Sequence, residues 1–266
     1  MFELLNTAVT AGGEVLLKYF RTQTLDITNK TDHQNIVTIA DKESQNAIQQ
    51  TIIRLMKAKG VTDVGFIGEE NLYHKGKHMF VIDPLDGTSN FASGIDYFCI
   101  PVAYFIDGQI QSSIISRPVT GDIYFAQKGL GASHIRNNEK TKLQIRHTPL
   151  KEKMLSAYSE DMLTLQPAVR TRIEQSFTSY RGVRALGAAA LHILGVAENT
   201  YGCSLLTYGP WIWDIAAAQL ILEESGGATY TWEGKPLMLD IEKKQQYGVV
   251  SCHPAQKEEI FSYLLD

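Results

Sequence analysis

The sequence predicts a mixed α+β and α/β fold made of two closely joined halves. Two segments with apolar residues at helical spacing come first, and a long series of strand-like segments follows them. Beyond these, helical and strand-like segments alternate to the end of the chain. We expect residues 1–147 to form a helix-and-sheet half with an antiparallel-rich sheet, and residues 148–266 to form an α/β half.

The first two expected elements are amphipathic helices. Residues 2–20 and 40–59 both place apolar side chains along one helical face. Between them, the polar segment 30–35 has no apolar period, so we expect a mobile loop that includes Lys30 and Asn35.

Strand-like segments follow the second helix. Segments rich in β-branched and aromatic residues predict strands near residues 64–67, 79–82, 98–106, 110–117, 122–126 and 142–146. Asp107 and Gly108 are typical of a two-residue hairpin turn. The second half predicts helices near residues 167–178, 188–198, 213–225 and from 254 onward, and strands near 201–206, 228–231 and 247–251.

The composition is that of a globular protein without a basic surface. At 266 residues and 44% hydrophobic content, the chain can bury a large core. The net charge of −4 and scattered Lys and Arg argue against a nucleic-acid partner. No segment has the length of a membrane span or the pattern of a secretory signal. Three distant cysteines without zinc-site spacing predict reduced, buried thiols in a cytoplasmic protein.

Residues 81–91, VIDPLDGTSNF, combine two carboxylates with a proline, a glycine and helix-starting residues. The proline cannot donate to a sheet, so the preceding strand should end near Asp83. Asp83, Asp86 and the Leu85 carbonyl between them offer the oxygen ligands that Mg²⁺ prefers. Gly87 permits close backbone approach, and the following N–H groups can bind an anion. The same residue types are common in turns, and an Asp-x-x-Asp pattern alone favours that plainer interpretation.

Three further acidic residues favour a metal site over a plain turn. Glu69 follows the expected strand 64–67, directly before the strand that ends at Asp83. If these two strands are neighbours, both carboxylates can bind one cation. Asp41 and Asp214 each open an expected helix, where a simple capping role also explains them.

With these residues, the chain resembles the inositol monophosphatase family of the Mg²⁺-dependent, lithium-sensitive sugar-phosphatase superfamily. Two long motifs carry the resemblance: IDPLDGTSNF at 82–91 and WDxAAAxxIxxExGG at 213–227. Two shorter motifs, NxVTxxD at 35–41 and GEE at 68–70, complete the set in the family order. The resemblance implies a layered αβαβα sandwich and a homodimer.

The resemblance also implies a set of metal ligands. It assigns Glu69, Asp83 and the Leu85 backbone oxygen to a first Mg²⁺. It assigns Asp83, Asp86 and Asp214 to a second, and Glu69 also reaches a third through water. Two or three cations at such spacing suit hydrolysis of a phosphate monoester.

The implied chemistry uses water rather than a covalent phosphoenzyme. The phosphate would rest on the cations, on Asp86 and on the backbone N–H groups of Gly87 and Thr88. Thr88, oriented by Asp41, would help to deprotonate a metal-activated water, with Glu69 as a further catalytic residue. The family resemblance places Lys30 and Asn35 in a mobile loop that closes over this site.

The substrate side departs from the animal inositol phosphatases in three places. Thr207 stands where that pattern has a glutamate that binds ring hydroxyls, and Trp211 stands where it has a histidine. In the segment Gly187, Ala188 and Ala189, Ala188 replaces a hydroxyl residue. Since a polyol pocket depends on each hydrogen bond, recognition of inositol is in doubt. Trp211 offers either an apolar wall to the substrate or ordinary aromatic packing.

The sequence therefore predicts a Mg²⁺-dependent phosphomonoesterase that acts on a small polyol or sugar phosphate. Fructose-1,6-bisphosphate, histidinol phosphate and a nucleotide 3′-phosphate remain open as substrates of the same chemistry. A metal-binding regulatory protein with little turnover is an alternative of another class. A two-metal nuclease is a third, and the acidic net charge counts against it.

Overall fold

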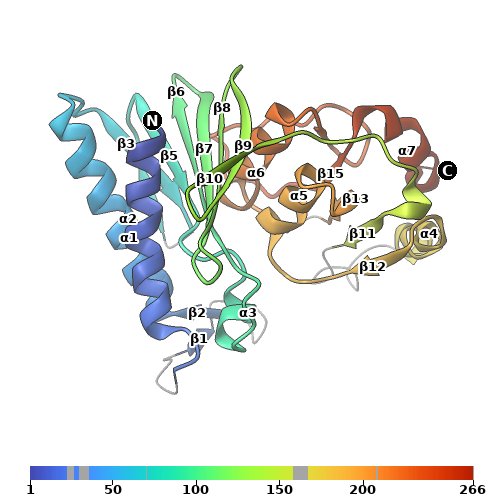
Figure 1. The fold of residues 1–266 in the computed structure, drawn as a ribbon, viewed down its shortest axis with the longest axis horizontal. Helices are drawn as coiled ribbons and strands as arrows, with labels where there is room; N and C mark the ends of the chain where they lie inside the picture. Colours follow the sequence, from blue (N-terminus) through green and yellow to red (C-terminus); the bar gives the residue numbers. More distant parts are fainter. Residues whose placement is uncertain (23–26, 30–35, 70, 158–166, 208, 266) are drawn as a thin grey trace.

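The protein is built in five layers, α/β/α/β/α (Figure 1). A computed structural model describes all residues except 23–26, 30–35, 70, 158–166, 208 and 266. Two N-terminal helices cover one face of a large sheet, two further helices fill the space between that sheet and a smaller one, and the last helices cover the outer face. This arrangement confirms the predicted fold class.

The helices include all of the predicted ones and a further five-residue helix after the acidic turn, which was not predicted. They are α1 (Phe2–Tyr19), α2 (Ile39–Ala58), α3 (Thr88–Ala92), α4 (Pro167–Ser176), α5 (Ala189–Ala197), α6 (Ile212–Glu224) and α7 (Lys257–Leu265). Within the described residues, none of them is both long and apolar enough to cross a bilayer.

The large sheet has the strand order β10-β9-β8-β7-β6-β5-β3-β4 among the residues that the structure describes. Its strands are β3 (Val64–Gly68), β4 (Leu72–His74), β5 (His78–Ile82), β6 (Ile100–Ile106), β7 (Gln109–Arg117), β8 (Asp122–Gln127), β9 (Gly131–Arg136) and β10 (Glu139–Leu143). All neighbours are antiparallel except β3 and β5. Asp107 and Gly108 join β6 to β7 with positive φ angles of 49° and 74°, as the predicted hairpin requires.

The small sheet belongs to the second half and has the order β12-β11-β13-β15-β14 in the described part of the chain. Its strands are β11 (Met154–Ala157), β12 (Gly182–Arg184), β13 (Tyr201–Leu206), β14 (Ala228–Tyr230) and β15 (Val249–Cys252). A separate short pair, β1 (Ile27–Asn29) and β2 (Ile36–Thr38), lies between α1 and α2 in the chain. The strands change from one sheet to the other on either side of residue 147, where we predict the boundary between the halves.

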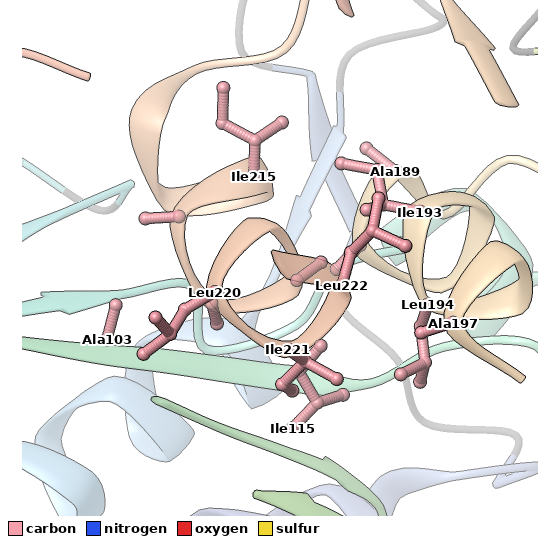
Figure 2. Close-up of a cluster of buried hydrophobic side chains, with 14 of the residues drawn as sticks. Ala103, Ile115, Ala189, Ile193, Leu194, Ala197, Ile215, Leu220, Ile221 and Leu222 are labelled. Atoms are coloured by element: carbon pink, nitrogen blue, oxygen red, sulfur yellow. The ribbon is translucent and has the colours of Figure 1, made fainter. Parts of the chain in front are cut away.

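Helices α5 and α6 form the middle layer and hold the two sheets together. Figure 2 shows Leu220 and Ile221 of α6 above Ala103 and Ile115 of the large sheet, with α5 beside them. Ile115 and Ile221 are fully buried, and burial of such a side chain contributes roughly 1.5–3 kcal/mol. Because α6 packs on the large sheet and follows a strand of the small one, the halves share a core.

Some strand predictions were wrong in extent or missing. The expected strand 142–146 ends at Leu143, because the Ile145 N–H donates to the Ser225 carbonyl at 2.9 Å and leaves the sheet. Strands β4, β9, β11 and β12 were not predicted, since three of them have only three or four residues and β9 is rich in polar side chains. The three cysteines are free and buried, as predicted.

Candidate active site

Adjacent parallel strands place two acidic side chains at the same edge of the large sheet. β3 pairs with β5 in parallel, and Gly68 lies opposite Ile82 at their carboxyl ends. Glu69 and Asp83 are the next residues along each strand. Burial raises the pKa of Asp83 well above its ordinary range, and the nearby Glu69 carboxylate raises it further.

A tight turn after β5 fixes the Asp83 carboxyl. The Leu85 N–H donates to Asp83 Oδ1 at 2.8 Å, and Ser44 of α2 donates from its hydroxyl to the Pro84 carbonyl at 3.0 Å. Asp86 then exchanges two backbone hydrogen bonds with Cys99, at 2.9 and 3.0 Å. Both aspartates are buried, with 2% and 6% of their surface exposed.

Asp86 connects the turn to the N-terminus of α5. Its two carboxylate oxygens accept hydrogen bonds from the backbone N–H groups of Ala189 at 2.9 Å and Ala190 at 2.8 Å. The Cys99 thiol lies 3.5 Å from Oδ2. Burial raises the pKa of Asp86 to about 7, although these hydrogen bonds favour the carboxylate. Asp86 therefore joins the large sheet to the middle layer at the site.

Asp214 is the acidic residue that the second half contributes. It lies in the first turn of α6, where its Oδ2 accepts the Trp211 N–H at 2.6 Å. Its carboxyl also shares a hydrogen bond with that of Asp83. Burial and the charges of Glu69 and Asp86 raise the pKa of Asp214 well above its ordinary range. Two carboxyl groups in such contact must hold a proton or a cation between them.

The donor set of this cluster suits a hard divalent cation. Its four carboxyl groups and the Leu85 carbonyl are all oxygen donors, which Mg²⁺ prefers. A bound cation would remove the mutual repulsion that raises these pKa values. Among the described residues, no group of three His, Cys, Asp or Glu side chains meets the spacing of a preformed metal site.

Gly87 and Thr88 follow the acidic turn, and the Thr88 hydroxyl faces α2. Gly87 has a φ of +96°, and a Cβ there would lie 2.9 Å from the Tyr97 carbonyl oxygen. The Thr88 hydroxyl lies 3.1 Å from Asp41 Oδ1 and 3.0 Å from the Leu85 carbonyl oxygen. Asp41 is fully buried in the first turn of α2. The structure thus brings the Thr88 hydroxyl and the Asp41 carboxylate together beside the acidic cluster.

The predicted substrate residues differ in how far they face the site. Ala188 is fully buried, Ala189 uses its N–H for Asp86, and Gly187 packs beside Asn90 with a φ of +72°. Thr207 is 1% exposed, and its hydroxyl has no partner among the described residues. Trp211 is half-buried. Lys30, Asn35 and most of the predicted mobile loop lie outside the described residues.

Three residues that the sequence did not suggest also build the site. Cys99 and Ala190 contact Asp86, and no local pattern indicates either contact. Asn90 donates from its amide to the carbonyls of Tyr97 at 2.7 Å and Leu186 at 2.6 Å. Its place in the motif of residues 82–91 was a signal that could have indicated this role.

Comparisons with known proteins show which family this chain resembles. Residues 1–265 match the profile described as the inositol monophosphatase family. A Thermotoga maritima protein named fructose-1,6-bisphosphatase/inositol-1-monophosphatase is 30% identical over 79% of this chain and 77% of its own. A Rhizobium meliloti inositol-1-monophosphatase is 30% identical over 88% of each chain. A Thermotoga maritima IMPase structure superposes with a TM-score of 0.83 at 25% identity, covering 99% of this chain and 95% of its own. The chain therefore belongs to the inositol monophosphatase family, as its motifs predict, and is a phosphatase of that family.

Proposed function

We propose that the protein is a Mg²⁺-dependent phosphomonoesterase that hydrolyses a small polyol or sugar phosphate. The observation that carries this proposal is the meeting of Glu69, Asp83, Asp86 and Asp214 beside the Thr88 hydroxyl. The carboxylates come from both halves of the chain and repel one another in the absence of a cation. A role in capping helices would not require this convergence.

The cation ligands would be Glu69, Asp83, Asp86, Asp214 and the Leu85 carbonyl, for two or three Mg²⁺. When bound, Mg²⁺ lowers the pKa of water and stabilises charge on the attacking and leaving oxygens. Asp83 is held by the Leu85 N–H and Asp86 by the start of α5, so their carboxylates need little ordering on binding.

The residues next to the cluster would position the water and the phosphate. The Thr88 hydroxyl donates to buried Asp41, which leaves a lone pair on Oγ1 to accept a hydrogen bond from water. Asp41 can then hold the proton that moves through Thr88. The backbone N–H groups of Gly87 and Thr88 would bind phosphate oxygens. In this proposal water is the nucleophile, and no covalent phosphoenzyme is required.

The relatives and the residues around the cluster indicate the class of alcohol. The Thermotoga maritima relative is named for both fructose-1,6-bisphosphate and inositol phosphate, which supports a polyol or sugar ester. Buried Thr207 and Ala188 offer few hydroxyl-binding groups, so strict selection for inositol is not expected. We further propose a cytoplasmic homodimer that Li⁺ inhibits, which light scattering and a Li⁺ titration would test.

Phosphate release from glycerol 2-phosphate, inositol 1-phosphate and fructose-1,6-bisphosphate, with Mg²⁺ or EDTA, tests the proposal. Activity should require Mg²⁺, and Asp83→Asn should lower kcat by about 10²–10³-fold, as loss of an essential electrostatic group does. Asp63→Asn is the matched control, because exposed Asp63 precedes the other end of β3. Full turnover in EDTA, or in the Asp83 variant, would contradict the proposal.

A further inference from the structure

A cavity of about 390 Å³ opens at the carboxyl end of β3, beside the start of α6. Its wall includes Glu69 from the acidic cluster and Trp211. The backbone N–H of Trp211 donates to Asp214 at 2.6 Å. One wall residue is thus a proposed cation ligand, and another is bonded to a second ligand. A cavity of this size fits a ring-sized group. An ester cleaved at the cluster would therefore have this space next to its leaving alcohol.

One wall of the cavity is an aromatic pair. The rings of Trp211 and Trp213 stack with centroids 5.4 Å apart and an interplanar angle of 16°. Leu72 of the edge strand and Ile241 from the chain after β14 add aliphatic surface. Both tryptophans are half-buried, so part of their surface stays accessible. Such a wall favours a ring with an apolar face over a freely hydrated polyol.

The segment that follows Ile241 adds charge at the cavity. Three charged side chains in it line the space, namely Glu242, Lys243 and Lys244. Lys243 pairs with Asp240 at 3.1 Å, and Glu242 lies 3.9 Å from Lys75. Among the described residues, Lys244 has no carboxylate partner.

Lys244 contacts the aromatic wall instead of a carboxylate. Its Nζ lies 5.7 Å from the centroid of the Trp211 ring. This cation–π contact holds an exposed ammonium group beside the cavity. The ammonium is therefore available to an anion that the cavity admits.

We infer that this cavity binds the leaving alcohol, and that the preferred substrate is a phosphate monoester of a ring that presents an apolar face and carries a second anionic group. Trp211 would select for the ring and Lys244 for the anion. This inference rests on the proposed function, since it takes the acidic cluster as the place where the ester is cleaved. It makes both residues determinants of specificity and leaves the hydrolytic residues unchanged.

Matched benzyl esters separate the ring from the charge. Initial rates of phosphate release would be measured for glycerol 2-phosphate, benzyl phosphate, 4-carboxybenzyl phosphate and its uncharged isostere 4-carbamoylbenzyl phosphate. We expect the carboxylate to lower KM about fivefold to tenfold relative to the amide, as one charge-assisted contact does. A 4-(phosphonomethyl)benzyl ester, which cannot lose its phosphonate, tests whether a second phosphorus anion is preferred to a carboxylate.

Two variants and one control assign the effect to its residues. Lys244→Gln should remove the KM difference between carboxylate and amide, and Trp211→Ala should raise KM for all benzyl esters about tenfold. KM for glycerol 2-phosphate should change less than twofold, and kcat should persist in both variants. Lys235→Gln, an exposed lysine that does not line this cavity, should change nothing.

The outcomes distinguish this inference from the proposed function. Only the inference fails if glycerol 2-phosphate is hydrolysed but the acid and amide esters have equal KM. The same holds if both variants keep the wild-type KM for every ester. If no ester is hydrolysed, the proposed function fails. Calorimetric binding of 4-carboxybenzylphosphonate with Mg²⁺ then still tests the cavity, and equal affinity for wild type and Lys244→Gln would overturn the inference.

Discussion

Thr88 Oγ1 lies 3.1 Å from Asp41 Oδ1, a contact that joins the start of α3 to the first turn of α2. Asp41 is completely buried, so this carboxylate is shielded from water on the side away from the acidic cluster. A hydroxyl that donates to a buried carboxylate has a fixed orientation. The pair therefore resembles a base and the group that it activates.

Two substitutions of Thr88 should separate the effect of its hydroxyl on activity from the effect of its side-chain volume. Thr88→Val keeps the side-chain volume and removes the donor to Asp41, so kcat should fall by about 10²–10⁴-fold. Thr88→Ser keeps the hydroxyl and should retain most activity. Steady-state kinetics with Mg²⁺ would measure both. Equal activity in the two variants would mean that the hydroxyl has no part in the reaction.

Gly87→Ala should be more damaging than an ordinary glycine substitution. Both Gly87 and Gly60 have positive φ, at +96° and +76°, but a Cβ at Gly60 would meet nothing within 4 Å. A Cβ at Gly87 would lie 2.9 Å from the Tyr97 carbonyl. Gly60→Ala should cost about 1 kcal/mol of unfolding free energy and Gly87→Ala at least 2 kcal/mol more, measured by urea denaturation. Equal losses would show that the turn accommodates the methyl group.

Asp214→Asn should stabilise the metal-free protein. The amide oxygen can still accept the Trp211 N–H, while one of the mutually repelling carboxylates is removed. In EDTA at pH 8, a gain of about 1 kcal/mol would raise Tm by roughly 2–4 °C. In Mg²⁺ the order should reverse, because the wild type gains about 2.7 kcal/mol at a concentration of 100 Kd and the variant gains less. Calorimetry in both buffers measures this, and equal Mg²⁺ stabilisation of both proteins would argue against Asp214 as a ligand.

Asp122 should make stability depend on acid pH, far from the active site. Burial raises its pKa, but hydrogen bonds from Arg136, Thr120 and His134 outweigh burial and hold the pKa below its ordinary value of 3.8. A lowered pKa in the folded state stabilises the protein above about pH 4, and this contribution is lost as pH falls further.

Asp122→Asn therefore should lower the free energy of unfolding by about 2 kcal/mol at pH 7, less than a fully buried pair would give because Arg136 is half exposed. The difference from wild type should shrink below pH 4. Urea denaturation at pH 7 and pH 3 would measure it, with exposed Asp107→Asn as a control. An undiminished difference at pH 3 would contradict the electrostatic explanation.

The elements with strong periodicity could be predicted from the sequence. Helices α1, α2, α5 and α6 and strands β3 and β5 lie within a residue or two of their expected bounds. The apolar residues of α1 and α2 repeat with a helical period, and the other four are nearly continuous apolar segments whose ends are marked by polar residues or glycine. Short strands such as β4 and β12 could not be predicted, since three residues carry little pattern and long-range pairing creates the strand.

The candidate site was predictable where a motif, a pair of neighbouring strands or the family resemblance indicated its residues, as for Glu69, Asp41 and Asp214. Asp83, Asp86 and Thr88 stand together in the sequence, so their proximity follows from a turn. The hydrogen bond from Ala190 to Asp86 spans 104 residues and depends on how α5 docks. The position of Lys244 at the cavity could not be predicted for the same reason, since no local signal indicates that its segment lies beside β3.

The layered arrangement makes completion of the acidic cluster depend on tertiary folding. Its members lie just after two strands of the large sheet and on the helix α6, which docks between the sheets. Glu69, Asp83 and Asp86 belong to the first half and Asp214 to the second, so the cluster is completed only when the two halves dock. The metal affinity that we propose would therefore report on the completed tertiary structure, and a refolding chain should regain it last.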